Sequence, residues 1–128
     1  MAEQLNVELV AADRKVWSGE ADIVIARTID GEIGILSGHA PVLGVLLSGA
    51  VQIRQQGGGL VIAAVHGGFL SVANNEVVIL AEEAELADEI DVEQAQRELD
   101  ERPDPDDEDA VAASQRARAR IRARELAS

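Results

Sequence analysis

Short apolar runs separated by turn-forming residues fill the first two thirds of the chain. In the first run, over 5–11, Leu5, Val7 and Leu9 alternate with the polar Asn6 and Glu8, which is the period-two pattern of a strand with one buried face. Further runs rich in β-branched and aliphatic residues follow at 22–29, 32–36, 50–55, 60–65, 68–72 and 76–80. Short strands at regular spacing predict a sandwich or a barrel.

The residues between these runs favour tight connections. Four groups supply the residues that most readily adopt positive φ, namely Asp30-Gly31, Gly57-Gly58-Gly59, Gly67-Gly68 and Asn74-Asn75, and we expect each to form a hairpin turn. A phosphate-binding loop is a poorer interpretation of the glycine triplet, because no Gly-Lys-Ser/Thr follows it and the only lysine is Lys15.

The pattern changes after residue 86. Val92, Ala95 and Leu99 recur at helical spacing behind Asp91, a good N-cap residue, so a short helix is expected to begin there. Pro103 and Pro105 should end this helix. We therefore divide the chain into a β-domain, 1–86, and a helical region, 87–128.

The charge of the helical region reverses along its length. Residues 82–109 contain fifteen acids against two arginines, and 103–109 is expected to be an exposed acidic hinge. A second helix is predicted over 110–128, where five arginines face one acid. Because the net charge is −13, the chain as a whole is not expected to bind nucleic acid or a membrane surface. The arginine-rich helix suits an acidic protein surface instead.

Catalytic chemistry has little support in the sequence. Only His39 and His66 could act as bases near neutral pH, and neither stands in a known nucleophile pattern. No ligand spacing indicates a metal site, no cofactor is expected, and Glu82, Glu83 and Glu85 are best interpreted as a solvated face. Three functions remain open: a binding and coupling subunit, a ligand-binding β-module, and a small hydrolase that uses a histidine. The scarcity of aromatic residues weighs against the ligand-binding module, because ligand pockets are commonly lined by aromatic side chains.

One stretch is not explained by turn chemistry alone. It reads Gly31-Glu32-Ile33-Gly34-Ile35-Leu36-Ser37-Gly38-His39-Ala40-Pro41, and it resembles the epsilon subunit of F-type ATP synthases. The order of the other segments is also similar to that family: the first strand over 5–11, Trp17-Ser18-Gly19, Gly49-Ala50-Val51-Gln52-Ile53, Gly67-Gly68-Phe69-Leu70 and Val77-Val78-Ile79-Leu80-Ala81. The resemblance covers nearly the whole chain.

The resemblance implies an antiparallel β-sandwich of about ten strands followed by a two-helix hairpin. It implies a non-catalytic rotor subunit in the central stalk, which couples proton-driven rotation to ATP synthesis. The expected partners are the gamma subunit, the c-ring, and the alpha and beta subunits. The expected location is the cytoplasmic face of a bacterial cell membrane, with membrane contact only through the complex.

The resemblance also assigns roles to particular residues. Glu32 and His39 are expected to contact the c-ring or gamma. The tail is expected to restrain ATP hydrolysis by placing its arginines, Arg116, Arg118, Arg120, Arg122 and Arg124, against an acidic segment of beta. Some family members bind ATP through the pattern Ile-Asp-x-x-Arg-Ala. The corresponding residues here are Ile90, Asp91, Gln94 and Ala95, so that Gln94 stands in place of the arginine. Weak or absent ATP binding is therefore predicted.

Overall fold

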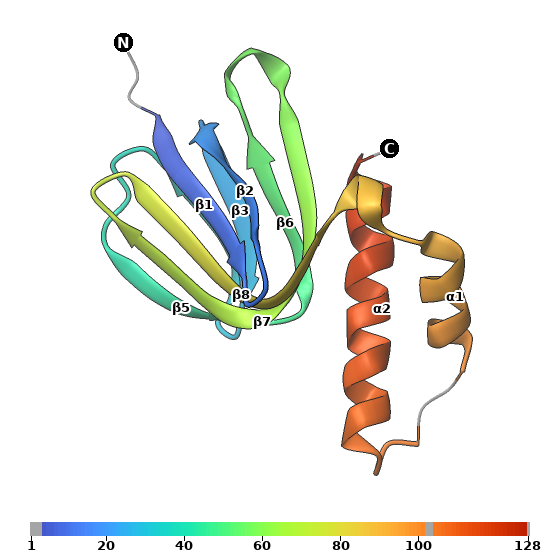
Figure 1. Ribbon diagram of the computed structural model, residues 1–128. Coiled ribbons are helices and arrows are strands. Elements are labelled where there is room, and N and C mark those ends of the chain that lie inside the picture. Colours follow the sequence, from blue (N-terminus) through green and yellow to red (C-terminus); the bar gives the residue numbers. More distant parts are fainter. Residues whose placement is uncertain (1–3, 102–103, 128) are drawn as a thin grey trace.

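The protein consists of a β-sandwich with a helix pair beside it (Figure 1). The structure, a computed structural model, describes residues 4–101 and 104–127. Eight strands are found there: β1 Leu5–Ala11, β2 Lys15–Ala21, β3 Ile23–Thr28, β4 Gly31–Leu36, β5 Val42–Leu46, β6 Gly49–Arg54, β7 Leu60–Ala73 and β8 Glu76–Leu86. The helices are α1, Val92–Asp100, and α2, Glu108–Ala127, with short 3-10 turns η1, Gln56–Gly58, and η2, Ala87–Glu89.

The strands pair in the order β2-β1-β8-β7-β5-β3-β4, and β6 lies between β3 and β7. The pairs are antiparallel except for β1 and β8, which run parallel. The predicted sandwich is confirmed, with one parallel pair that was not expected. β1 is the first strand in the sequence of the domain and β8 is the last. The strands between them in sequence provide the long crossover connection that parallel pairing requires.

β7 passes from one layer of the sandwich to the other. Its residues 60–65 pair with β6, whereas 68–72 pair with β5. Gly67 and Gly68 lie at this corner with φ of 72° and 118°, and a Cβ on Gly68 would overlap the carbonyl oxygen of Leu80. The predicted hairpin turn at these glycines is wrong, because their positive φ bends the strand without reversing it. If β7 and β8 are each counted as two segments, the count rises from eight to the expected ten.

The other predicted turns are confirmed, and two strands are additional. Asn74 and Asn75, with φ of 52° and 63°, connect β7 to β8, as a tight two-residue turn requires. The sequence did not indicate β2 or β5 as strands. Among the described strands β2 pairs only with β1, and it leaves most of its side chains exposed or half-buried. β5 exposes Leu43 and Val45, so neither strand shows a clean alternation.

Two apolar clusters hold the molecule together. The main core lies between the two layers and includes fully buried Leu5, Leu9, Ile35, Ile53, Leu70 and Ile79. A smaller cluster lies under α2 and joins Ile62 and Ala64 of β7 to Ala87, Ile90 and Ala123. The first half of β7 is therefore buried on both faces, since Ala63 and Val65 point into the main core.

The helix pair folds back against this second cluster, so that α2 lies between the sandwich and α1 (Figure 1). The Asp91 N-cap is confirmed, because its carboxylate accepts a 3.1 Å hydrogen bond from the backbone N–H of Gln94. α2 begins at Glu108, two residues earlier than predicted, because Asp107 caps it by accepting from the N–H of Ala110 at 3.1 Å. The exposed hinge therefore ends at residue 107, and its first residue, Pro103, lies outside the described residues.

Candidate functional site

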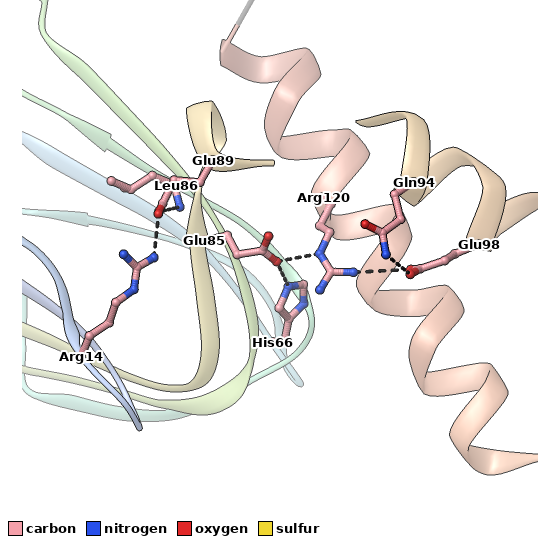
Figure 2. Close-up of polar contacts among 8 residues, drawn as sticks. All are labelled: Arg14, His66, Glu85, Leu86, Glu89, Gln94, Glu98 and Arg120. Atoms are coloured by element: carbon pink, nitrogen blue, oxygen red, sulfur yellow. Dashed lines mark hydrogen bonds and ion pairs between the residues drawn. The ribbon is translucent and has the colours of Figure 1, made fainter. Parts of the chain in front are cut away.

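A cluster of charged side chains joins the β-domain to the helices, and Arg120 of α2 lies at its centre (Figure 2). Its Nε donates a 2.6 Å hydrogen bond to Oε1 of Glu85 on β8, and its Nη1 lies 3.5 Å from Oε2 of Glu98 on α1. The side chain of Arg120 is 21% exposed, so this pair is shielded more than a surface ion pair. One guanidinium thus connects β8, α2 and α1.

His66 of β7 lies beneath α2 in the same cluster (Figure 2). The residue is 4% exposed, and its Nε2 is 3.5 Å from Oε1 of Glu85. Burial lowers the pKa of His66, and the cation of Arg120 lowers it further. The carboxylate of Glu85 raises this pKa, but by less, so that the pKa remains below its ordinary value. Folding does bring a carboxylate to this histidine, but α2 covers the ring and closes it to a substrate, which weighs against the hydrolase interpretation.

A second ion pair ties the start of the helical region to the β-domain. Arg14, in the connection between β1 and β2, donates from Nη2 to Oε1 of Glu89 at 2.7 Å, and the same oxygen accepts from the N–H of Leu86 at 3.0 Å. These two hydrogen bonds, with that from Arg14 the larger effect, hold the pKa of Glu89 below its ordinary range. The pKa of Arg14 is raised in turn.

The structure separates the five arginines predicted to contact the beta subunit. Arg120 is engaged within the chain, whereas Arg118, Arg122 and Arg124 are exposed and Arg116 is half-buried. Arg122 lies 3.6 Å from Glu125 on the same helix. Arg118 and Arg122 also line a groove of about 510 Å³ between α2 and strands β3, β4 and β6.

Glu32 and His39 stand at opposite ends of β4, a strand about 17 Å long. Glu32 pairs in register with Arg27 of β3, and both line the groove beside α2. His39 follows the other end of the strand, where its Nδ1 is 2.7 Å from the carbonyl oxygen of Ala40. The structure does not bring these two predicted contact residues together.

The residues of the degenerate nucleotide motif have structural roles. Ile90 and Ala95 are 8% and 1% exposed, and Asp91 caps α1. Gln94 directs its side-chain amide toward Oε1 of Glu98 at 3.5 Å (Figure 2). Gln94 therefore faces a carboxylate that also contacts Arg120.

An apolar row on the outer face of the β5-β7-β8 layer was not predicted. The strand register places Val45, Phe69 and Leu80 side by side, and they are 42%, 52% and 51% exposed. Phe69 is the only phenylalanine in the chain. We call these three residues the apolar row.

Two further features concern metal binding and membrane crossing in the described residues. Over residues 4–101 and 104–127, no three or more side chains of histidine, aspartate or glutamate gather as they would around a metal ion. Within the same residues, none of the helices combines the length and the apolar character needed to cross a membrane.

Comparisons with known proteins agree with this architecture. Residues 4–87 match the family described as ATP synthase, Delta/Epsilon chain, beta-sandwich domain. The chain is 65% identical over 100 residues to the ATP synthase epsilon chain of Streptomyces griseus, covering 78% of this chain and 81% of that one. It is 54% identical over 105 residues to the epsilon chain of Rhodococcus jostii, covering 81% and 85%.

A solved structure is also similar. A chain of the Euglena gracilis mitochondrial ATP synthase, in a structure of its OSCP, F1 and c-ring, superimposes with a TM-score of 0.78 at 26% identity, covering 97% of this chain and 81% of that one. The fold and the ion-paired helices define a class: a β-sandwich domain that carries a docked helix pair. The chain belongs to the ATP synthase delta/epsilon chain family, and the predicted identity as an epsilon subunit of a bacterial F-type ATP synthase is confirmed. The epsilon chain is a non-catalytic subunit of that complex.

Proposed function

We propose that this epsilon chain binds the gamma subunit through the apolar row formed by Val45, Phe69 and Leu80. Three neighbouring strands present these side chains on one sheet face, and a contiguous exposed apolar surface on an otherwise highly charged chain is typical of a protein interface. Leu43, 76% exposed on β5, extends the surface. Phe69 is the expected anchor, because aromatic side chains commonly carry much of the binding energy.

The two ends of β4 are proposed to contact different partners. Glu32 lies near the β3-β4 turn, where Ile29 is 58% exposed. Leu47, which is 41% exposed, lies close to this turn, because its backbone N–H donates a 3.1 Å hydrogen bond to the carbonyl oxygen of Arg27. This end combines a carboxylate with apolar side chains and is proposed to rest on the polar loops of the c-ring. His39, which precedes β5 and its exposed Leu43, is proposed to contact gamma.

The helical region is proposed to restrain ATP hydrolysis by contacting the alpha and beta subunits. Arg116, Arg118, Arg122 and Arg124 are the cations proposed to meet an acidic segment of beta, with Arg120 joining them only after it leaves Glu85. The complex is proposed to lie at the cytoplasmic face of the cell membrane, with the epsilon chain joining the proton-driven ring to the catalytic head.

Reconstitution with gamma, alpha and beta tests the gamma contact. Phe69→Ser should weaken binding to gamma at least tenfold, because it removes a large apolar anchor at the centre of the row. Leu60→Ser is the matched control, since Leu60 is 47% exposed on the other half of β7 and outside the row. Equal binding by both variants would reject the apolar row as the interface.

Truncation tests the tail separately. A chain that ends at Asp88 should bind gamma normally and should release the restraint on ATP hydrolysis by the reconstituted complex. If hydrolysis stays unchanged, the tail has no inhibitory role, and the proposed gamma interface is unaffected by that result.

A further inference from the structure

His66 is a buried titratable side chain that neither the sandwich core nor the proposed partner contacts require. In the first half of β7, Ala63 and Val65 point into the sandwich, whereas Ile62 and Ala64 contact the cluster under α2. His66 continues the second set and lies near Arg120 (Figure 2), and the packing of α2 on β7 leaves it only 4% exposed. Undocking α2 would return the ring to water, and the docking equilibrium is therefore linked to the protonation of His66.

Charged groups reach the ring from two sides. Glu85 and Glu83 come from β8, and Arg120 comes from α2 with Glu98 of α1 behind it. Arg120 already holds Glu85 at 2.6 Å, so this carboxylate has a cation partner before His66 gains any charge. Among the described residues, Nε2 of His66 has one long contact, 3.5 Å to Oε1 of Glu85, and beyond it neither ring nitrogen has a hydrogen-bond partner. A neutral imidazole is the form that this site accommodates best.

We propose that His66 acts as a pH sensor for the helix pair: α1 and α2 stay docked on the β-domain while the ring is neutral, and they lift when it takes up a proton. A proton on the ring would place a second cation beside Arg120 in a site from which water is largely excluded. Two cations would then share Glu85, and the docked arrangement would lose stability relative to the undocked one, in which His66 and Arg120 are both solvated.

The direction of the pH dependence follows from the lowered pKa of docked His66. Above about pH 6.5, the ordinary value for histidine, both states hold a neutral ring and docking is strongest. As the pH falls below that value, the undocked state takes up the proton first, and the undocking constant rises by up to about tenfold per pH unit until the docked ring also titrates. The effect on ATP hydrolysis rests on the proposed function of the tail: mild acidity would free Arg120 and its neighbours for an acidic partner.

Two measurements on the isolated full chain test the sensor. The chain has two histidines, so NMR titration should resolve one signal each for His39 and His66, and the pKa of His66 should lie below the ordinary histidine value of about 6.5. Hydrogen exchange of the α2 amides, corrected for the intrinsic pH dependence of exchange, should show an undocking constant that rises between pH 7.5 and 5.5.

Variants separate the sensor from a structural role of the side chain. His66→Leu should remove the pH dependence while α2 stays docked, and His66→Gln provides the same test with a polar uncharged side chain if the leucine variant folds poorly. His39→Gln is the matched control and should keep the full pH dependence. Unchanged pH dependence in both His66 variants would overturn the proposal, as would a pKa of His66 at or above the ordinary histidine value of about 6.5. Neither outcome bears on gamma binding, which the Phe69 variant tests separately.

Discussion

Arg120 on α2 donates a 2.6 Å hydrogen bond to Glu85 on β8, and this contact ties the arginine-rich helix to the β-domain. Arg120, the middle one of the five arginines predicted to contact beta, is therefore already paired with a carboxylate of its own chain. Any engagement of the full row of arginines by a partner must first break this contact. Docking of the helices and the proposed binding of the tail to a partner would thus compete for the same side chain.

Arg120→Gln should weaken docking of the helix pair by about 1–2 kcal/mol, because it leaves a half-buried Glu85 without its cation. Faster hydrogen exchange across α2 at neutral pH is the measurement. Arg124→Gln serves as the control, since Arg124 is exposed on the same helix and should change exchange little. Equal effects of the two variants would show that total helix charge, and not the contact with Glu85, controls docking.

Gly68→Ala should destabilise the β-domain by about 2–4 kcal/mol, since the new Cβ would overlap the backbone of β8 at a residue with φ of 118°. Thermal unfolding should show a fall in Tm of about 7–15 °C. Gly34→Ala is the control, because no atom of the described residues lies within 4 Å of a Cβ built there and its φ is not positive. A Tm for Gly68→Ala close to that of the control would contradict a corner at this glycine.

The anchor formed by Arg14 and Glu89 should fail in acid. The pKa of Glu89 is lowered by the hydrogen bond from Arg14, so the anchor contributes stability above the ordinary glutamate pKa of about 4.3 and loses it as the pH falls through the lower folded value. Hydrogen exchange over 86–90 should therefore rise below about pH 4.

Arg14→Gln should remove this acid-dependent step. Lys15→Gln should retain it, because Lys15 contacts Glu8 at 3.5 Å on a different surface. If the step survives in Arg14→Gln, another carboxylate is responsible for it.

ATP should bind more weakly than the micromolar range, as calorimetry can measure. Gln94→Arg alone should not restore binding, because Glu98 lies 3.5 Å from the Gln94 amide and would pair with the added cation. Gln94→Arg combined with Glu98→Gln should bind ATP more tightly than either single variant. Micromolar affinity in the unaltered chain would contradict the prediction.

Several parts of the fold could be predicted because they depend on neighbours in the sequence. The alternation over 5–11 predicts β1, the asparagine pair at 74–75 predicts the β7-β8 turn, and Asp91 predicts the start of α1. The prediction at the glycines of 67–68 was wrong, because positive φ is compatible both with a turn that reverses the chain and with a bend inside one strand. Only the pairing of β7 with both β5 and β6 distinguishes the two.

That corner also decides which side chains point outward. Before it, Ala63 and Val65 face the sandwich core; after it, Leu70 and Val72 do, so the inward set changes from odd to even numbers. A period-two pattern carried through the glycines therefore misplaces Phe69.

The sequence by itself determined the family, the β-then-α order and the arginine-rich end, because motifs, strand periodicity and composition are local properties. Only the tertiary structure decided that Val45, Phe69 and Leu80 form one exposed row, because the register of β5, β7 and β8 aligns residues far apart in the chain. It also decided that Arg120, alone among the five tail arginines, contacts Glu85 within the described residues. The physical reason is that charge pairing depends on distance in space, which the packing of α2 against β7 sets.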